Sequence, residues 1–232
     1  MSQQVVLIAF QIVVLILAFS VHECAHAWTA WRLGDPTARM LGRVTLNPLK
    51  HLDPLGSVLF PLISLVYGGF LVGWAKPTPV TARNFKNYKR DDILVTLAGP
   101  ASNLLSATIA LILLLFMKHL VPNGVVSIAA AMALAQHVPG IVTEGLPTLF
   151  PIALFLYFVI LINLLLFVFN LIPIPPLDGS HILRHFLPYR AVQVYDRMGM
   201  FGLIILFLVG GRFIFAVFSP LFATFNHILF TL

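Results

Sequence analysis

Long apolar runs broken by short polar stretches form the pattern of this chain. Between Val5 and Trp31 the one Lys, Arg, Asp or Glu is Glu23. A predominantly apolar run of about 20 residues is long enough to cross a bilayer as a helix. The pattern therefore predicts four transmembrane helices, at residues 5–33, 93–117, 149–172 and 199–218.

Shorter or interrupted apolar stretches lie between and after these helices. Residues 57–73 contain Pro61, and residues 125–145 contain Pro139 and Glu144. Each of the two either crosses the bilayer or dips into it and returns to the same side. The final run, residues 220–232, is apolar but short for a span.

The positions of Lys and Arg favour return over crossing. No basic residue precedes Arg32, and a dense group follows it: Arg39, Arg43, Lys50, Lys76, Arg83, Lys86, Lys89 and Arg90. Because cytoplasmic loops carry an excess of Lys and Arg, residues 57–73 are expected to return. The basic cluster at residues 184–197 is cytoplasmic as well if residues 125–145 also return. We therefore expect an external N-terminus.

Composition agrees with a multi-span membrane protein. Charged residues make up 9% of the chain, whereas soluble domains carry about 25%. The net charge of +6 comes from loops beside apolar runs, so it indicates membrane orientation and no binding of nucleic acid. The single cysteine, Cys24, excludes an internal disulfide and a Cys-rich zinc site. No basic segment precedes the first apolar run, so a removable signal peptide is not expected.

His22, Glu23 and His26 form an H-E-x-x-H motif inside the first predicted helix. Residues four apart lie one turn apart on the same helix face, so two imidazoles can bind one zinc ion. A histidine pair is often only part of a packed core. Here the pair and a Glu would be buried in lipid without a ligand, which is costly. We interpret the motif as a zinc site in which Glu23 is the general base.

Asp178 is the candidate for a third zinc ligand. It follows the third predicted helix after Pro173, Pro175 and Pro176, which prevent a continuous helix. Taken alone, an Asp before Gly179 is more typical of a turn or a helix cap. The predicted topology, however, places Asp178 and the H-E-x-x-H motif toward the same cytoplasmic side. Two imidazoles and one carboxylate leave a fourth tetrahedral position for water, as a catalytic zinc requires.

Several motifs resemble the site-2 protease family of intramembrane zinc metalloproteases. They are His22-Glu23-x-x-His26, the stretch from Gly42-Arg43 to Asp53-Pro54-Leu-Gly56, Gly73-Trp-Ala-Lys76-Pro77, Ala98-Gly99-Pro100-x-x-Asn103, and Asn170-x-x-Pro173-x-Pro-x-Leu177-Asp178-Gly179. The first and the last of these are highly specific in this order, each near the end of a membrane helix. The match covers much of the chain.

The resemblance implies zinc ligands His22, His26 and Asp178, one Zn²⁺ per chain, and Glu23 as general base. It implies an enzyme that hydrolyses peptide bonds within or near the transmembrane helices of membrane proteins. Its partners are then a transmembrane substrate protein and the lipid bilayer. The expected location is a bacterial or archaeal cell membrane, with the active site toward the cytoplasm. The chain resembles the compact subgroup that lacks a PDZ domain and a nucleotide-binding tail.

The expected fold is an all-α multi-pass membrane protein. The resemblance implies a three-helix catalytic core, joined here by further transmembrane helices and re-entrant or interfacial segments. We expect one membrane-embedded metalloprotease domain at residues 1–232, with the catalytic core at about residues 5–180 and C-terminal helices at 181–232. Residues 41–46 alternate as a strand does, which suggests a short β-hairpin there. The resemblance implies an edge strand at this place that pairs with an extended substrate.

Three polar residues are weaker candidates for the site. Asn103 and Asn170 lie within the second and third predicted helices, where Asn needs a partner. Either residue stabilises an oxyanion or binds an unwound substrate backbone, or it only bonds a neighbouring helix. His51 lies in a Pro-bounded loop and either approaches a zinc ligand or is solvated.

Other functions use a similar pattern. A zinc transporter needs no Glu between two histidines and would have more polar residues along its path. A membrane non-haem iron oxygenase needs many clustered histidines, and here only His22/His26 and His181/His185 have the i, i+4 spacing. A catalytically silent relative would lack a catalytic residue, and none is missing. A metalloprotease is therefore the favoured function.

Overall fold

The computed structural model describes residues 3–66, 73–138, 145–209 and 211–232. The described chain is helical, and the predicted all-α multi-pass fold is confirmed. Its helices are α1 (Gln3–Arg32), α2 (Thr37–Met40), η1 (Pro48–Lys50), η2 (Pro54–Leu59), α3 (Phe60–Val66), η3 (Ala82–Asn84), α4 (Tyr88–Leu120), α5 (Gly124–Ala135), α6 (Phe150–Asn170), α7 (Asp178–Arg184), α8 (Tyr189–Val209) and α9 (Gly211–Thr231).

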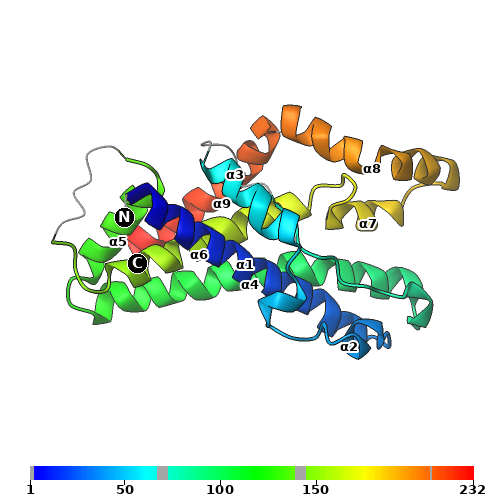
Figure 1. The fold of residues 1–232 in the computed structure, drawn as a ribbon, viewed down its shortest axis with the longest axis horizontal. Coiled ribbons are helices and arrows are strands. Elements are labelled where there is room, and N and C mark those ends of the chain that lie inside the picture. The colour runs from blue at the N-terminus through cyan, green and yellow to red at the C-terminus, as the bar shows by residue number, and fades with distance from the viewer. Residues whose placement is uncertain (1–2, 67–72, 139–144, 210) are drawn as a thin grey trace.

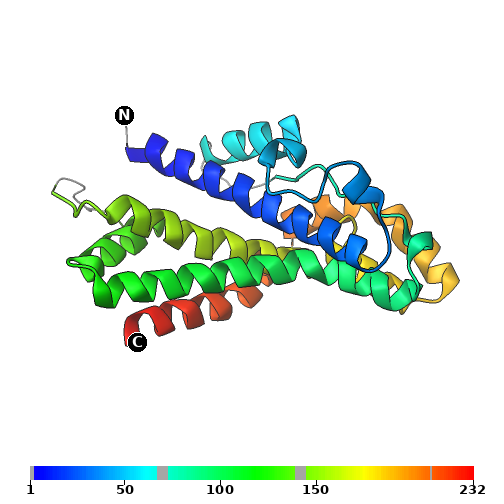
Figure 2. The same ribbon diagram turned by 90° about the horizontal axis from the view of Figure 1, so that it is seen from below.

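Three long helices, α1, α4 and α6, form the centre of the molecule and pack against one another along its length (Figures 1 and 2). They correspond to the first three predicted transmembrane helices. Their shared core contains Leu15 from α1, Leu114 from α4 and Tyr157 and Leu164 from α6, all almost fully buried. Each helix is long and apolar enough to cross a membrane. The three helices that form this core are therefore the ones predicted from the sequence.

The fourth spanning helix differs from the prediction of residues 199–218. Helix α8 ends at Val209, and α9, which runs from Gly211 to Thr231, is the fourth helix long and apolar enough to span. Gly199 has a φ of +40°, which interrupts α8 where the predicted span began. Pro220 lies inside α9, and helices in apolar surroundings accommodate proline when neighbours satisfy the freed backbone groups. The terminal run that looked too short is thus part of a span.

The two ambiguous apolar segments do not form long helices in the described residues. The main-chain N–H of Trp74 donates a 3.0 Å hydrogen bond to the Gly56 carbonyl, so the ends of the segment that contains α3 lie side by side. This agrees with the predicted return of residues 57–73. Helix α5 has 12 residues and is about 18 Å long, short of a hydrocarbon core about 30 Å thick. Residues 67–72 and 139–144 lie outside the described part.

The strand predicted at residues 41–46 is wrong, because these residues form turns and bends. Arg43 is buried while Leu41 and Leu46 are exposed, so the alternating pattern does not correspond to an apolar buried face of a strand. The backbone here bonds a side chain and not a second strand. The carbonyl of Thr45 accepts from His51 Nε2 at 2.8 Å. No residue of the described chain is in a β-strand.

An extended segment, residues 73–81, runs back beside α1 and reaches the region of the H-E-x-x-H motif. The carbonyl of His51 accepts from the N–H of Lys76 at 2.8 Å, which fixes its beginning. The carboxylate of Asp35, which is fully buried, accepts from the N–H of Thr81 at 2.7 Å and fixes its end. The same carboxylate also accepts from the Asn84 amide. These bonds place a loop far along the chain against the end of α1.

Candidate metal centre

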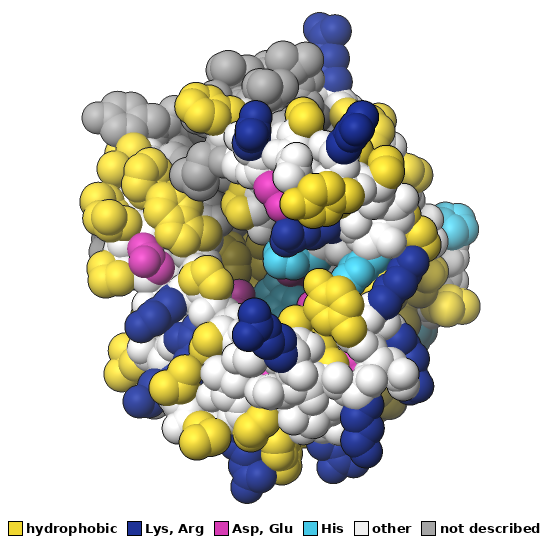
Figure 3. All heavy atoms as spheres, turned by 90° about the vertical axis from the view of Figure 1, so that its right-hand side faces the viewer, with side chains coloured by type: hydrophobic (Ala, Val, Ile, Leu, Met, Phe, Trp, Pro, Cys, Tyr) yellow, Lys and Arg dark blue, Asp and Glu magenta, His cyan; other side chains and the backbone are white. Residues whose placement is uncertain are grey.

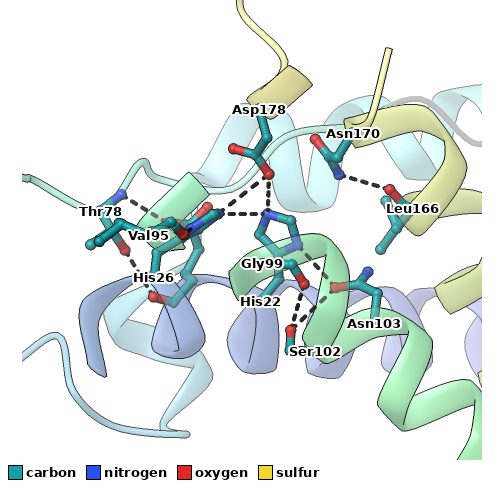
Figure 4. Close-up of polar contacts among 11 residues, drawn as sticks. His22, His26, Thr78, Val95, Gly99, Ser102, Asn103, Leu166, Asn170 and Asp178 are labelled. Atoms are coloured by element: carbon teal, nitrogen blue, oxygen red, sulfur yellow. Dashed lines mark hydrogen bonds and ion pairs between the residues drawn. The ribbon is translucent and has the colours of Figure 1, made fainter. Parts of the chain in front are cut away.

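His22 and His26 project from one face of α1 toward Asp178, the first residue of α7 (Figure 4). Their Nε2 atoms are 3.0 Å apart. Asp178 Oδ2 lies 3.2 Å from His22 Nε2 and 3.4 Å from His26 Nε2. Both histidines are buried. The sequence-predicted trio is therefore together, with its three ligand atoms meeting at one point.

Hydrogen bonds on the far side of each ring decide which nitrogen faces this point. His26 Nδ1 lies 2.7 Å from the carbonyl of Val95, which can only accept, so Nδ1 carries the proton. His22 Nδ1 lies 2.9 Å from Asn103 Oδ1 and is a donor for the same reason. In the neutral rings both Nε2 atoms then present lone pairs to each other at 3.0 Å. Such a pair needs a cation or a proton between the two rings.

The distances fit a zinc ion. Zinc binds His nitrogen and carboxylate oxygen at about 2.0–2.2 Å, so two ligand atoms at tetrahedral angles are about 3.3 Å apart. The three observed separations, 3.0, 3.2 and 3.4 Å, are close to this value. Asp178 Oδ2 is also buried without a hydrogen-bond partner among the described residues. The donor set could therefore hold one metal ion and leave a fourth position open.

The pKa of the Asp178 carboxyl lies below its ordinary value. Burial would raise this pKa, but positive charge held at the His22 and His26 rings, as a proton or a cation, outweighs burial and holds the pKa well below its usual range. A carboxylate is the form that binds a metal, since ligands must be deprotonated. The electrostatics of the trio thus agree with its geometry.

Gly99 on α4 makes room for the two imidazole rings. A Cβ at this position would lie 2.3 Å from His26 Nε2 and 2.6 Å from atoms of the His22 ring, closer than real contacts allow. The helix backbone therefore approaches the site as closely as it can. Pro100 lies inside the same helix directly after Gly99. The Gly in the Ala-Gly-Pro motif thus serves the packing of the two histidines.

Glu23, between the two histidines, is held by the extended segment. Its Oε2 accepts a 2.8 Å hydrogen bond from the main-chain N–H of Thr78, and its own carbonyl accepts from Thr78 Oγ1 at 3.0 Å. Glu23 is nearly buried. This carboxylate is oriented by a main-chain donor and belongs to the residue that directly follows His22.

The two candidate asparagines have different partners. Asn103 is fully buried, its Oδ1 accepts from His22, and its Nδ2 has no hydrogen-bond partner among the described residues. Asn170 Nδ2 donates at 3.0 Å to the carbonyl of Leu166, one turn earlier in α6 (Figure 4). Asn103 is therefore part of the site through His22, while the contact of Asn170 is within its own helix. A direct role for either in substrate binding stays a prediction.

His51 is fully buried, so it is not a solvated loop residue. Its Nε2 bonds the Thr45 carbonyl and none of the three candidate ligands. Burial, together with the nearby Arg43 charge, lowers the pKa of His51, although the bond to Thr45 opposes the shift. The predicted contact with a zinc ligand is not among its hydrogen bonds. In the structure His51 instead supports the loop and, through its carbonyl, the extended segment.

One end face of the molecule is rich in basic side chains. Figure 3 shows this face with a central hollow in which histidine side chains lie, surrounded by Lys and Arg side chains.

Comparison with known proteins assigns the chain to a family. The model of Peptidase family M50 matches residues 10–209, most of the chain. The chain belongs to peptidase family M50. It is 39% identical over 203 residues to "Putative zinc metalloprotease YwhC" of Bacillus subtilis, which covers 88% of this chain and 80% of that relative. It is 31% identical over 196 residues to "Putative zinc metalloprotease Rip2" of Mycobacterium tuberculosis, covering 83% of this chain and 64% of that relative. No solved structure matches the chain significantly.

Membership in family M50 agrees with the resemblance drawn from the motifs. This M50 protein is a zinc metallopeptidase, and its apolar helices make it an integral membrane protein in contact with lipid. The family assignment rests on the whole matched region and is independent of the distances within the site. The residues that hold the metal and move protons are assigned below.

Sequence reasoning missed the residues that act through their backbone. Val95 contributes its carbonyl and Thr78 its N–H, and main-chain groups leave no residue-type signal in a sequence. From the sequence, Arg43 is only a loop charge that bears on topology and a member of one motif. It is buried and donates to the carbonyls of Lys50, Lys76 and Pro77, which steadies the extended segment next to Glu23. The signal available in the sequence was an Arg placed in a loop of a membrane protein.

Proposed function

We propose that this M50 protein is an intramembrane protease that cuts peptide bonds within or near transmembrane helices, in regulated intramembrane proteolysis. The observation that carries the proposal is the meeting of Asp178 with His22 and His26, which lie beside Glu23 on a helix long and apolar enough to span. Peptide hydrolysis at this depth gives access to bonds in lipid-embedded segments of other proteins. The partner is then a transmembrane substrate protein.

We assign one zinc ion per chain to the Nε2 atoms of His22 and His26 and to Asp178 Oδ2. Zinc held there would act as a Lewis acid and lower the pKa of a water to about 7. The two imidazoles are kept in the ligand tautomer by Val95 and Asn103. Asp178 contributes the negative charge that offsets the cation.

Glu23 is the proposed general base. It takes a proton from the attacking water at its carboxylate and later delivers that proton to the leaving amine. The N–H of Thr78 keeps one carboxylate oxygen in place, so the side chain does not need to be ordered during the reaction. Asn103 Nδ2, buried and without a partner in the described chain, is a candidate donor to the developing oxyanion.

The substrate helix must unwind before it is cut. In a helix the scissile carbonyl is hydrogen-bonded and side chains shield the backbone from attack. Gly, Pro or Asn near the bond lowers the cost of opening that turn. The Pro-rich backbone between α6 and α7 and the segment that contains α3 are the candidates to admit such an opened strand. We infer that a pre-trimmed, single-pass protein is the preferred substrate.

The proposed location is the cell membrane of a bacterium or archaeon, with the site toward the cytoplasm. Lys and Arg gather on the face that carries the hollow with histidines (Figure 3). Because cytoplasmic faces carry the excess of basic residues, this face is the cytoplasmic one. We further propose that residues 1–232 act as one membrane-embedded domain, with the catalytic core at about residues 5–180.

The test is cleavage of a defined substrate by the purified protein in lipid nanodiscs. The substrate is a single-pass helix with one Gly or Asn near its cytoplasmic end, and mass spectrometry identifies the products. The proposal predicts a cut inside or next to the apolar segment, which stops with a zinc chelator and resumes with zinc. Cleavage only in the soluble flanks, or cleavage that the chelator leaves unchanged, would contradict it. A matched helix with Leu at the Gly or Asn position should be cut more slowly.

A further inference from the structure

One face of α4 contacts both imidazoles of the candidate metal centre. Asp92, Val95, Gly99 and Asn103 are spaced three or four residues apart and therefore lie along one side of the helix. Val95 and Asn103 bond the two imidazoles, and Gly99 leaves space for their rings. The first member of this stripe, Asp92, contacts neither imidazole. Its partner lies on the segment that carries the third ligand.

Asp92 forms an ion pair with His185, which directly follows the last residue of α7. The distance between Asp92 Oδ2 and His185 Nε2 is 2.6 Å, and the exposed fractions of the two side chains are 18% and 8%. The ring of Tyr88 packs edge-on against His185, with ring centroids 5.3 Å apart. Helix α7 begins with Asp178, so the pair lies at one end of the short helix and the candidate ligand at the other.

At the other end of α7, where Asp178 lies, the preceding backbone forms no helix or strand that could hold α7 in place. The backbone between Asn170 and Asp178 forms turns and bends that contain three prolines. Gly179 packs so closely against the Leu171 carbonyl that a Cβ would lie 2.3 Å from it. Contact with α4 is therefore what relates α7 to the two histidines, which α4 also holds in place.

We propose that Asp92 and His185 are positioning residues for the metal centre. Their partly buried pair fixes α7 against the start of α4 and thereby holds the Asp178 carboxylate at the distance from His22 and His26 that one metal ion requires. The inference rests on the proposed assignment of Asp178 as a zinc ligand. The pair acts through α7 and touches neither the metal nor the substrate.

A second ion pair at the same end of α7 provides a matched control. Arg184 Nη2 lies 2.9 Å from Asp196 Oδ2, and both side chains are about half exposed. Exposed pairs contribute little to stability because solvent screens them. Asp196→Asn therefore removes the same charge as Asp92→Asn from a neighbouring contact of the same helix, but from a pair that is far more exposed than Asp92 and His185.

The experiment measures zinc affinity by chelator competition in purified protein. Asp92→Asn and His185→Ala should weaken zinc binding at least about tenfold, as loss of supporting contacts around metal ligands usually does. His185→Gln keeps an N–H donor for Asp92 and should recover most of the affinity. Asp196→Asn should stay within about twofold of the wild type. The absorption spectrum of the cobalt-substituted protein should change in Asp92→Asn, since the geometry around Asp178 changes.

Two controls separate the possible failures. Thermal unfolding of the zinc-free proteins should be similar for the wild type and Asp92→Asn. If the zinc-free forms of Asp92→Asn and His185→Ala lose the same thermal stability relative to the wild type, and His185→Gln does not restore it, the pair is merely structural and the proposal is overturned. Unchanged zinc affinity in Asp92→Asn and His185→Ala, while Asp178→Ala loses zinc, would overturn this inference alone. If Asp178→Ala keeps wild-type zinc affinity, the ligand assignment itself fails and the positioning role with it.

Discussion

The main-chain N–H of Thr78 donates a 2.8 Å hydrogen bond to Glu23 Oε2, which joins two residues 55 positions apart. The loop that supplies this donor is held by Arg43, whose guanidinium bonds the carbonyls of Lys76 and Pro77. The H-E-x-x-H motif supplies the carboxylate, and a distant loop supplies its orientation. Activity should therefore depend on the main-chain N–H of Thr78, a residue that the sequence does not predict as part of the site.

Thr78→Pro removes this N–H between two existing prolines. Hydrogen bonds to charged groups contribute about 1.5–3 kcal/mol, so the rate of cleavage should fall roughly 10- to 100-fold. Zinc content should be unchanged, because the lost bond serves Glu23 and none of the ligands. Thr78→Val, which keeps the N–H and loses the hydroxyl, should retain most activity. Equal rates for Thr78→Pro and Thr78→Val would show that the main-chain bond is unimportant.

Gly99→Ala should disturb the metal site directly. Its Cβ would lie 2.3 Å from His26 Nε2, so at least one imidazole must move. Zinc retention during dialysis against a chelator should drop together with activity. Gly211→Ala is the control, because a Cβ at Gly211 has no neighbour within 4 Å. A Gly99→Ala protein that holds zinc as well as Gly211→Ala would contradict the close packing of α4 on the two rings.

Substitutions at Asn103 should separate its two functional groups. Asn103→Ala removes the partner of His22 Nδ1 and should lower zinc affinity about 10- to 100-fold. Asn103→Asp keeps an acceptor for His22 but loses the unpartnered Nδ2 donor, so it should keep zinc and lose turnover. The measurement is zinc affinity and cleavage rate in the same preparations. Full turnover in Asn103→Asp would exclude the Nδ2 group as an oxyanion donor.

The topology can be tested by labelling single cysteines in a Cys24→Ser background. Lys86→Cys should react with a membrane-impermeant reagent only from the cytoplasmic side, because the segment that contains α3 returns to the side from which it left α1. A cysteine at position 2 should react from outside. External labelling of position 86 would require residues 57–73 to cross the bilayer and would overturn the proposed orientation.

Local patterns predicted the parts of the site that depend on spacing within one helix. The i, i+4 pair His22 and His26 needs only the regular geometry of α1. Asp178 required a topological argument, since it meets the histidines through a fold that brings the ends of two helices together. The pair of Asp92 and His185, 93 residues apart, has no local pattern and could not be inferred.

The errors in the predicted fold also have local causes. Residues 41–46 alternate in polarity as a strand does, but their backbone bonds side chains such as His51 in place of a second strand. The fourth span was placed too early, because the apolar run continues from the end of α8 into α9. Hydrophobicity alone does not locate a helix break such as the one at Gly199, whose φ is +40°.

The most direct test of the account measures zinc content and substrate cleavage in the same purified samples of the wild type, Glu23→Gln and Asp178→Ala. The proposed zinc site predicts one zinc per chain and cleavage for the wild type, because all three ligands and the base are present. Glu23→Gln should keep its zinc and lose cleavage, since Glu23 moves a proton and is no ligand. Asp178→Ala should lose both. Near-wild-type cleavage by Glu23→Gln, or full zinc content and activity in Asp178→Ala, would contradict it.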